Sequence, residues 1–281
     1  MKTGLVLEGG AMRGLFSAGV IDVFLENDIN FEAMVGVSAG AAFGCNYISR
    51  QKGRALRYNV DYCRNWKYCS FRSLLFTGNM FGADFCYHEL PDKLDIFDVE
   101  TFKNNETDFY VVATDVETGK AVYHKCTDAG YADLEWIRAS ASMPLVSQIV
   151  KADSFKLLDG GIADSIPLKF FKELGYEKNV VVLTQPRDYI KGKNKLIGLS
   201  KILLRKYPHL LDTMERRHEI YNEQRKYLFE EEKKGNVLII CPKEKLPVGR
   251  IEHDAEKLKE AYEIGKNEAL ENLEKIREFI K

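Results

Sequence analysis

The stretch GLVLEGGAMRG at residues 4 to 14 decides the fold, because it couples a short apolar run to a glycine-rich turn. An apolar run of this length that enters such a turn is typical of a buried strand. Apolar residues then recur at helical spacing from Leu15 to Leu25, and Asn27-Asp28 supplies a stop signal. We therefore expect a strand, a tight turn and a helix at the start of the chain.

A second unit of the same kind follows directly. Residues 31 to 35 form another apolar run, which leads into GVSAG at 36 to 40 and then into a small-residue helix that ends near residue 50. Two strand and helix units in succession predict an α/β fold with parallel strands.

The remaining chain predicts further strands and a helical C-terminal part. Apolar runs predict a hairpin at 109 to 124, a helix at 134 to 143, and strands at 155 to 158, 180 to 184 and 237 to 241. The tail after Asp254, its predicted N-cap, has apolar residues at steps of three and four, so we expect an amphipathic helix packed on the sheet. We interpret residues 1 to 281 as one domain, with a core at 3 to 185, a charged helical insertion at about 190 to 234, and a terminal strand and helix at about 236 to 281.

Composition excludes several classes of protein. Of the 281 residues, 45% are hydrophobic and 30% are charged, which allows a sizeable core and argues against disorder. The net charge of -1 gives no overall attraction to nucleic acid. The six cysteines form no C-x-x-C pair, and no window resembles a signal peptide or a spanning helix. We expect a cytoplasmic protein with reduced thiols, no metal, no cofactor and no nucleic-acid partner.

The pentapeptide GVSAG has the pattern G-x-S-x-G at a point where a strand is expected to turn sharply into a helix. In that geometry the serine hydroxyl is exposed, and the flanking Gly36 and Gly40 relieve crowding. An incidental serine in a tight turn would have the same five letters, but the strand before it and the helix after it favour a nucleophile elbow. Ser38 is therefore the candidate nucleophile.

A serine nucleophile needs backbone N–H groups that stabilise the tetrahedral oxyanion, each contributing about 3 kcal/mol. The glycine-rich turn can supply the amides of Gly9, Gly10, Ala11 and Met12, at a helix N-terminus that favours an anion. A nucleotide phosphate loop is the alternative. The residues disfavour this alternative. A Walker A loop needs Lys-Ser or Lys-Thr where Gly14 is followed by Leu-Phe, and the dinucleotide fingerprint needs glycine at the position of Ala11.

The catalytic base could be an aspartate or a histidine. An α/β-hydrolase supplies an aspartate and then a histidine after its serine, and three histidines could fill that order: His209, His218 and His253. They lie in charged stretches typical of solvated surface, and that fold places several strands before its elbow rather than two. Asp159 instead ends an apolar strand and precedes Gly160-Gly161, which allows close approach to another loop. A carboxylate bonded to Ser38 could take its proton and return it to the leaving alcohol, so Asp159 is favoured.

The three motifs together resemble a known family. EGGAMRG at 8 to 14, GVSAG at 36 to 40 and DGG at 159 to 161 are similar, in this order, to the motifs of patatin-like phospholipases. RASASMP at 138 to 144 adds to the similarity, which runs from residue 3 to about 185. The later part resembles a bacterial branch of the family.

The resemblance implies a three-layer α/β/α fold with a mostly parallel central sheet and C-terminal helical additions. It implies a dyad of Ser38 and Asp159, no metal, and an oxyanion hole at Gly10 and Ala11. It also implies that Arg13 faces a substrate phosphate or the hole itself. The motif glycines that the resemblance carries over are Gly14, Gly36, Gly40, Gly160 and Gly161.

One position departs from the family pattern. A third consecutive glycine is usual where this chain has Ala11. If that position needs a positive φ, alanine costs about 1 kcal/mol and reshapes the hole. The amide donor is retained, so the departure does not imply an inactive protein.

Two segments outside the motifs bear on lipid contact. The aromatic stretch from Trp66 to Tyr87 has enough apolar surface to line an acyl-chain pocket or form an interfacial lid, or it is ordinary core. Residues 187 to 206 hold seven basic residues against one acid, with Leu196, Leu199 and Leu203 on one helical face. That segment is either a solvated insertion helix or a surface for anionic lipid.

The sequence therefore predicts a lipid acyl ester hydrolase, of phospholipase A, lysophospholipase or esterase type, that acts through an acyl-Ser38 intermediate. The expected partner is a lipid or ester substrate, with peripheral contact to the inner membrane face. One alternative is an acyltransferase that uses the same elbow. The other is a catalytically weak lipid-binding protein, which is favoured if Ser38 and Asp159 lie too far apart to hydrogen-bond.

Overall fold

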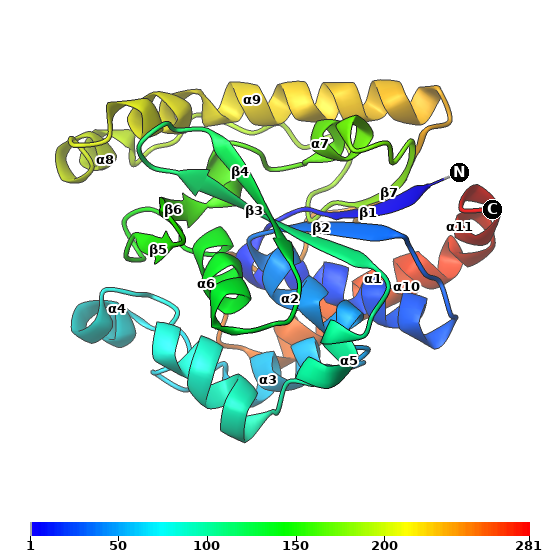
Figure 1. The fold of residues 1–281 in the computed structure, drawn as a ribbon, viewed down its shortest axis with the longest axis horizontal. Coiled ribbons are helices and arrows are strands. Elements are labelled where there is room, and N and C mark those ends of the chain that lie inside the picture. Colours follow the sequence, from blue (N-terminus) through cyan, green and yellow to red (C-terminus); the bar gives the residue numbers. More distant parts are fainter. Residues whose placement is uncertain (1) are drawn as a thin grey trace.

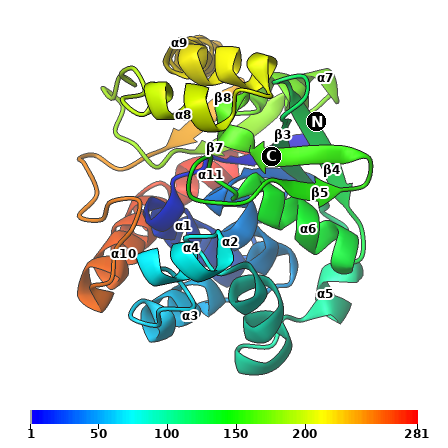
Figure 2. The ribbon, with the colours of Figure 1, turned by 90° about the vertical axis from the view of Figure 1, so that its left-hand side faces the viewer.

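The computed structural model describes residues 2–281 as a mixed β-sheet with helices on both faces (Figures 1 and 2). Within this range the strands form one eight-stranded sheet of order β5-β6-β3-β2-β1-β7-β8, with β4 also paired to β3. The strands are β1 (Thr3–Leu7), β2 (Ala33–Val37), β3 (Asp108–Asp115), β4 (Ala121–Cys126), β5 (Val150–Ala152), β6 (Phe155–Asp159), β7 (Lys178–Val182) and β8 (Val237–Ile240).

The centre of the sheet is parallel. Strands β3, β2, β1, β7 and β8 pair in parallel, and β1 and β2 are buried along their whole length because helices cover both faces. Antiparallel pairs lie at one side, where β4 and β6 flank β3 and β5 pairs with β6. The predicted hairpin is β3 and β4, whereas β5 was not expected.

Helices form the two outer layers (Figure 1). On one side of the sheet lie α1 (Leu15–Glu26), α2 (Ala39–Ile48), α3 (Arg54–Tyr62), α4 (Phe71–Thr77), α5 (Val99–Lys103), α6 (Tyr131–Ser140), α10 (Ala255–Glu271) and α11 (Leu273–Phe279). On the other lie α7 (Leu168–Glu173), α8 (Ile197–Leu203) and α9 (Pro208–Lys233). Three further helical segments are not α-helices. Two are 3₁₀ turns, η1 (Ala11–Gly14) and η3 (Gly160–Ile162), and one is a π-helix, η2 (Phe85–Leu94). The predicted three-layer α/β/α class with C-terminal helical additions is confirmed.

The C-terminal helix differs from the expectation in what it packs against. Asp254 caps α10 as predicted, with its side chain accepting from the Glu256 amide. The helix lies on α1 rather than on the sheet. A Cβ at Gly19 would lie 2.1 Å from the Tyr262 carbonyl oxygen, and one at Gly265 would lie 1.9 Å from that of Phe16. Two glycines thus let the two helix backbones approach too closely for any larger residue.

Helix α9 has a buried face, which its highly charged sequence did not predict. Tyr221 and Leu228 are buried against the sheet side, and the Tyr221 hydroxyl donates to Glu8 Oε1 at 2.5 Å. The other Glu8 oxygen accepts from the Thr184 amide at 2.6 Å. The helical insertion is therefore anchored to the glycine-rich turn rather than being only a solvated addition.

Candidate active site

Ser38 lies at the turn between β2 and α2, with φ 56° and ψ -120°. This left-handed backbone is strained for a residue with a side chain, as expected where a strand turns sharply into a helix. In the described chain the positive-φ glycines lie elsewhere, so the motif glycines serve close approach instead. A Cβ at Gly9 would lie 2.8 Å from Ser38 Cβ, and one at Gly40 would lie 2.4 Å from the Leu7 carbonyl oxygen.

Ser38 and Asp159 meet although 121 positions separate them. The Ser38 hydroxyl donates to Asp159 Oδ2 at 2.7 Å, and Asp159 Oδ1 accepts from the Gly161 amide at 2.8 Å. Burial raises the pKa of Asp159 above its ordinary value, while Arg217 and the two hydrogen bonds oppose the rise. A carboxylate with a raised pKa, hydrogen-bonded to a hydroxyl, is suited to accept its proton.

The segment RASASMP holds both of these residues in place. The Ser140 hydroxyl accepts from the Ser38 amide at 2.8 Å, and the Ser142 carbonyl accepts from the Asp159 amide at 2.8 Å. The sequence marked this segment by resemblance alone and assigned it no role. The end of α6 thus positions the two facing loops against each other.

The glycine-rich turn offers free amides beside Ser38. Among residues 2–281, the amides of Gly9, Gly10 and Ala11 donate no hydrogen bond, whereas the Met12 amide donates to the Arg250 carbonyl at 3.4 Å. Ala11 has φ 50°, so the position does adopt the left-handed backbone that favours glycine. The backbone strain that alanine would cause at this position is therefore present.

An apolar cavity opens on one side of Ser38. Its walls come from α2, α3, the aromatic stretch, η2 and α6, and include Phe43, Tyr58, Tyr68, Phe81, Tyr87 and Leu90. Part of the aromatic stretch therefore lines this cavity. Another part, Phe71, Leu75 and Phe76 of α4, is exposed instead.

A polar cavity opens on the other side of Ser38. Arg13 lines it, together with Gly9, Gly10 and Asp159. Three further cations, Lys191, Arg217 and Arg250, also line it. Sequence reasoning did not assign these three to the site, although Arg217 and Tyr221 at four-residue spacing share one helical face.

The three histidines considered as a base lie away from Ser38. Within residues 2–281, no histidine lines either cavity. Nδ1 of His218 lies 3.1 Å from the Glu215 carbonyl oxygen, and Nδ1 of His253 lies 2.6 Å from that of Cys63. Among the described residues, the Ser38 hydroxyl bonds to Asp159 and to no histidine.

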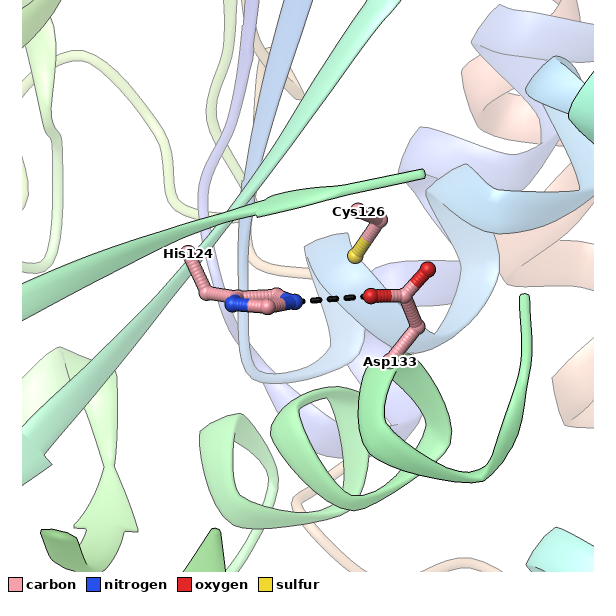
Figure 3. A group of neighbouring side chains, drawn as sticks. All are labelled: His124, Cys126 and Asp133. Atoms are coloured by element: carbon pink, nitrogen blue, oxygen red, sulfur yellow. Dashed lines mark hydrogen bonds and ion pairs between the residues drawn. The ribbon is translucent and has the colours of Figure 1, made fainter. Parts of the chain in front are cut away.

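A group that resembles a metal site lies elsewhere, at His124, Cys126 and Asp133 (Figure 3). Asp133 Oδ1 bonds to His124 Nε2 at 2.7 Å, and its Oδ2 accepts from the backbone amides of residues 127, 128 and 129. The carboxylate is thus already fully used as a cap for the loop before α6. Burial raises the pKa of the Cys126 thiol, which disfavours the thiolate that a metal requires.

The fold and the arrangement of the three motifs define an α/β protein in which Ser38 lies at a sharp turn from strand to helix. The family model described as patatin-like phospholipase matches residues 5–172, and the chain belongs to this family. A second model, a domain of unknown function (DUF6363), matches residues 207–281. None of the helices in residues 2–281 combines the length and apolar character that crossing a bilayer requires.

The chain is also similar to individual known proteins. The uncharacterized protein YjjU of Escherichia coli (strain K12) is 30% identical over 66% of this chain and 52% of its own length. The lysophospholipase nte1 of Emericella nidulans is 28% identical over 61% of this chain and 11% of its own length. The chain thus spans about half of the first relative and about a tenth of the second. Among solved structures, VipD from Legionella pneumophila is similar over 98% of this chain and 67% of that chain, with TM-score 0.48 and 11% identity.

Proposed function

We propose that the chain is a lipid acyl ester hydrolase in which Ser38 is the nucleophile and Asp159 is the general base and acid. The observation that carries the proposal is the 2.7 Å hydrogen bond between the Ser38 hydroxyl and the Asp159 carboxylate. That distance disfavours the alternative of a lipid-binding protein without catalysis. Membership of the patatin-like phospholipase family supports the same substrate class.

The geometry suits a two-step reaction. Ser38 Oγ attacks the ester carbonyl carbon while its proton passes to Asp159 Oδ2. The free amides of Gly9, Gly10 and Ala11 stabilise the oxyanion; the Met12 amide is already engaged and is left out of this role. The carbon–oxygen bond to the alcohol then breaks, and Asp159 protonates the departing alkoxide.

Hydrolysis of the acyl-Ser38 ester repeats these steps with water. Asp159 takes a proton from the water as its oxygen attacks the acyl carbon, and then returns the proton to Ser38 Oγ. The acyl chain occupies the apolar cavity, where each buried methylene contributes about 0.8 kcal/mol. Long or medium acyl chains are therefore the preferred substrates.

Contact with a lipid surface is part of the proposal. Figures 1 and 2 show α4 and α8 on the same side of the molecule. Helix α4 exposes Phe71, Leu75 and Phe76, and the segment of α8 exposes Leu196, Leu199 and Leu203. The basic residues around α8 add attraction to anionic lipid.

A fluorophosphonate probe and an ester substrate test the nucleophile together. The wild-type chain should be labelled covalently and should hydrolyse p-nitrophenyl butyrate, and Ser38→Ala should lose both. Ser165→Ala is the matched control, because Ser165 also lines the polar cavity but its hydroxyl donates to the Gly161 carbonyl. Equal labelling of the wild type and Ser38→Ala would remove Ser38 from this role.

A further inference from the structure

The polar cavity beside Ser38 is lined by four cationic side chains from four separate segments. Arg13 comes from η1, Lys191 from the loop after β7, Arg217 from α9 and Arg250 from the loop after β8. Only two carboxylates, Glu8 and Asp159, are among its lining residues in the described chain. Three of the cations lie outside residues 5–172, the part that the family model matches.

Both carboxylates are already engaged. Glu8 accepts from Tyr221 and Thr184, and Asp159 accepts from Ser38 and Gly161. Within residues 2–281, none of the four cations forms an ion pair at salt-bridge distance. Clustered cations without partners are costly unless an anion joins them.

Three of these side chains lie against the Gly161 loop, in the buried interior or against α9. Arg217 donates through Nε to the Gly161 carbonyl, at 2.5 Å, and its Nη2 lies 3.2 Å from where a Cβ on Gly161 would be. The Nε of Arg13 is buried and has no partner among the described residues. The Lys191 ammonium lies over the Tyr221 ring, 4.1 Å from its centroid.

The charges act on one another strongly. Burial lowers the pKa of Lys191 to about 7, and Arg217, Arg250 and Arg13 add to this effect, whereas Glu8 opposes it. Burial also lowers the pKa of Arg217; the nearby Asp159 carboxylate opposes this effect, and Arg250 adds to it. A bound dianion would relieve this repulsion and would favour the protonated form of Lys191.

We propose that Lys191, Arg217 and Arg250, with Arg13, bind a phosphate group that carries no ammonium substituent, as in an acyl ester of glycerol phosphate. The inference rests on the proposed function, because it places the acyl chain in the apolar cavity and the phosphate on the opposite side of Ser38. Choline and ethanolamine headgroups are disfavoured, since no free carboxylate in the described cavity would face their positive charge. The C-terminal part of the chain therefore sets headgroup specificity.

The test compares esters that differ only in the phosphate. The full chain is assayed in mixed detergent micelles on 1-oleoyl lysophosphatidic acid, 1-oleoyl lysophosphatidylcholine and 1-monooleoylglycerol. Lys191→Gln and Arg250→Gln should lower the ratio of kcat/KM for lysophosphatidic acid over monooleoylglycerol at least about tenfold. The controls are Lys193→Gln and Arg216→Gln, which remove exposed cations close in sequence to Lys191 and Arg217. They should leave the ratio within about twofold, because surface charges interact weakly.

Inorganic phosphate distinguishes a lipid headgroup from a free anion. It should compete with p-nitrophenyl butyrate at constant ionic strength in the wild type and less in Lys191→Gln. If this inhibition depends on Lys191 but the lipid ratio does not, the ligand is free phosphate.

The proposal is overturned if both the lipid ratio and the phosphate inhibition are the same in Lys191→Gln and Lys193→Gln. A wild type that hydrolyses no ester would contradict the proposed function instead. In that case, thermal stabilisation by inorganic phosphate, present in Lys193→Gln and absent in Lys191→Gln, would still support the phosphate site.

Discussion

The two cavities that meet at Ser38 differ in chemistry and in the part of the chain that builds them. The apolar cavity is lined by residues between 11 and 147, within the part of the chain that the family model matches. The cationic cavity combines the motif loops with side chains from residues 185 to 250. Under the two proposals above, acyl selection and headgroup selection are encoded in separate segments, so that each can change without the other.

The largest effect is expected from Asp159→Asn, because Asp159 is the proposed base for every ester, whichever acyl chain or headgroup the two cavities hold. The amide keeps the size of the side chain but cannot accept the Ser38 proton, so kcat/KM should fall by at least about a thousandfold. The loss should be similar for charged and neutral esters, measured by initial rates, with circular dichroism to confirm the fold. His218→Gln and His253→Gln are the controls; a comparable loss in either would indicate a conventional triad.

A smaller effect is expected on the apolar side alone. Ala42 lines the apolar cavity one turn after Ser38, and Ala42→Trp should exclude part of the acyl chain. Losing two buried methylenes costs about 1.6 kcal/mol, or roughly a tenfold drop in the preference for dodecanoyl over butanoyl p-nitrophenyl esters. Ala132→Trp, at an exposed position of α6, is the control. A drop in chain-length preference of the same size in the control would show that the cavity does not select the chain.

The smallest effect concerns Ala11, which lines both cavities. Ala11→Gly removes the cost of a side chain at φ 50° and should raise the free energy of unfolding by up to about 1 kcal/mol, less the entropy that glycine adds to the unfolded chain. Urea denaturation measures the change. Ala132→Gly within α6 should have the opposite sign, a loss of about 0.5 to 1 kcal/mol. A loss for Ala11→Gly as large as the loss for Ala132→Gly would show that the strain is absent.

The sequence predicted the site best where one short segment contains both a strand and its turn. The β1 and β2 turns and the DGG motif were located because glycine, serine and aspartate directly follow apolar runs there, and because the three motifs occur in the order typical of the family. Boundaries were less accurate: β2 lies at Ala33–Val37 rather than 31 to 35. The end of a strand depends on its partners, which the local pattern does not contain.

Residues that act through long-range contacts were not predictable. Ser140 contacts the Ser38 amide across 102 positions, and its own neighbourhood gives no sign of this role. Arg217 and Lys191 looked like ordinary members of a charged helix and loop. They line one cavity with Glu8 and Asp159, and α9 is held beside Glu8 by Tyr221; only the folded chain reveals this arrangement.

By itself, the sequence determined the class of fold, the elbow serine and the aspartate, because backbone geometry and local motif chemistry restrict those positions. The tertiary structure alone decided how the charges are distributed around them. It brought four cations from distant segments to one side of Ser38 and aromatic side chains to the other. The physical reason is that electrostatic interactions and burial depend on distance in space, and residues far apart in the chain become neighbours only when the sheet and its two helical layers assemble.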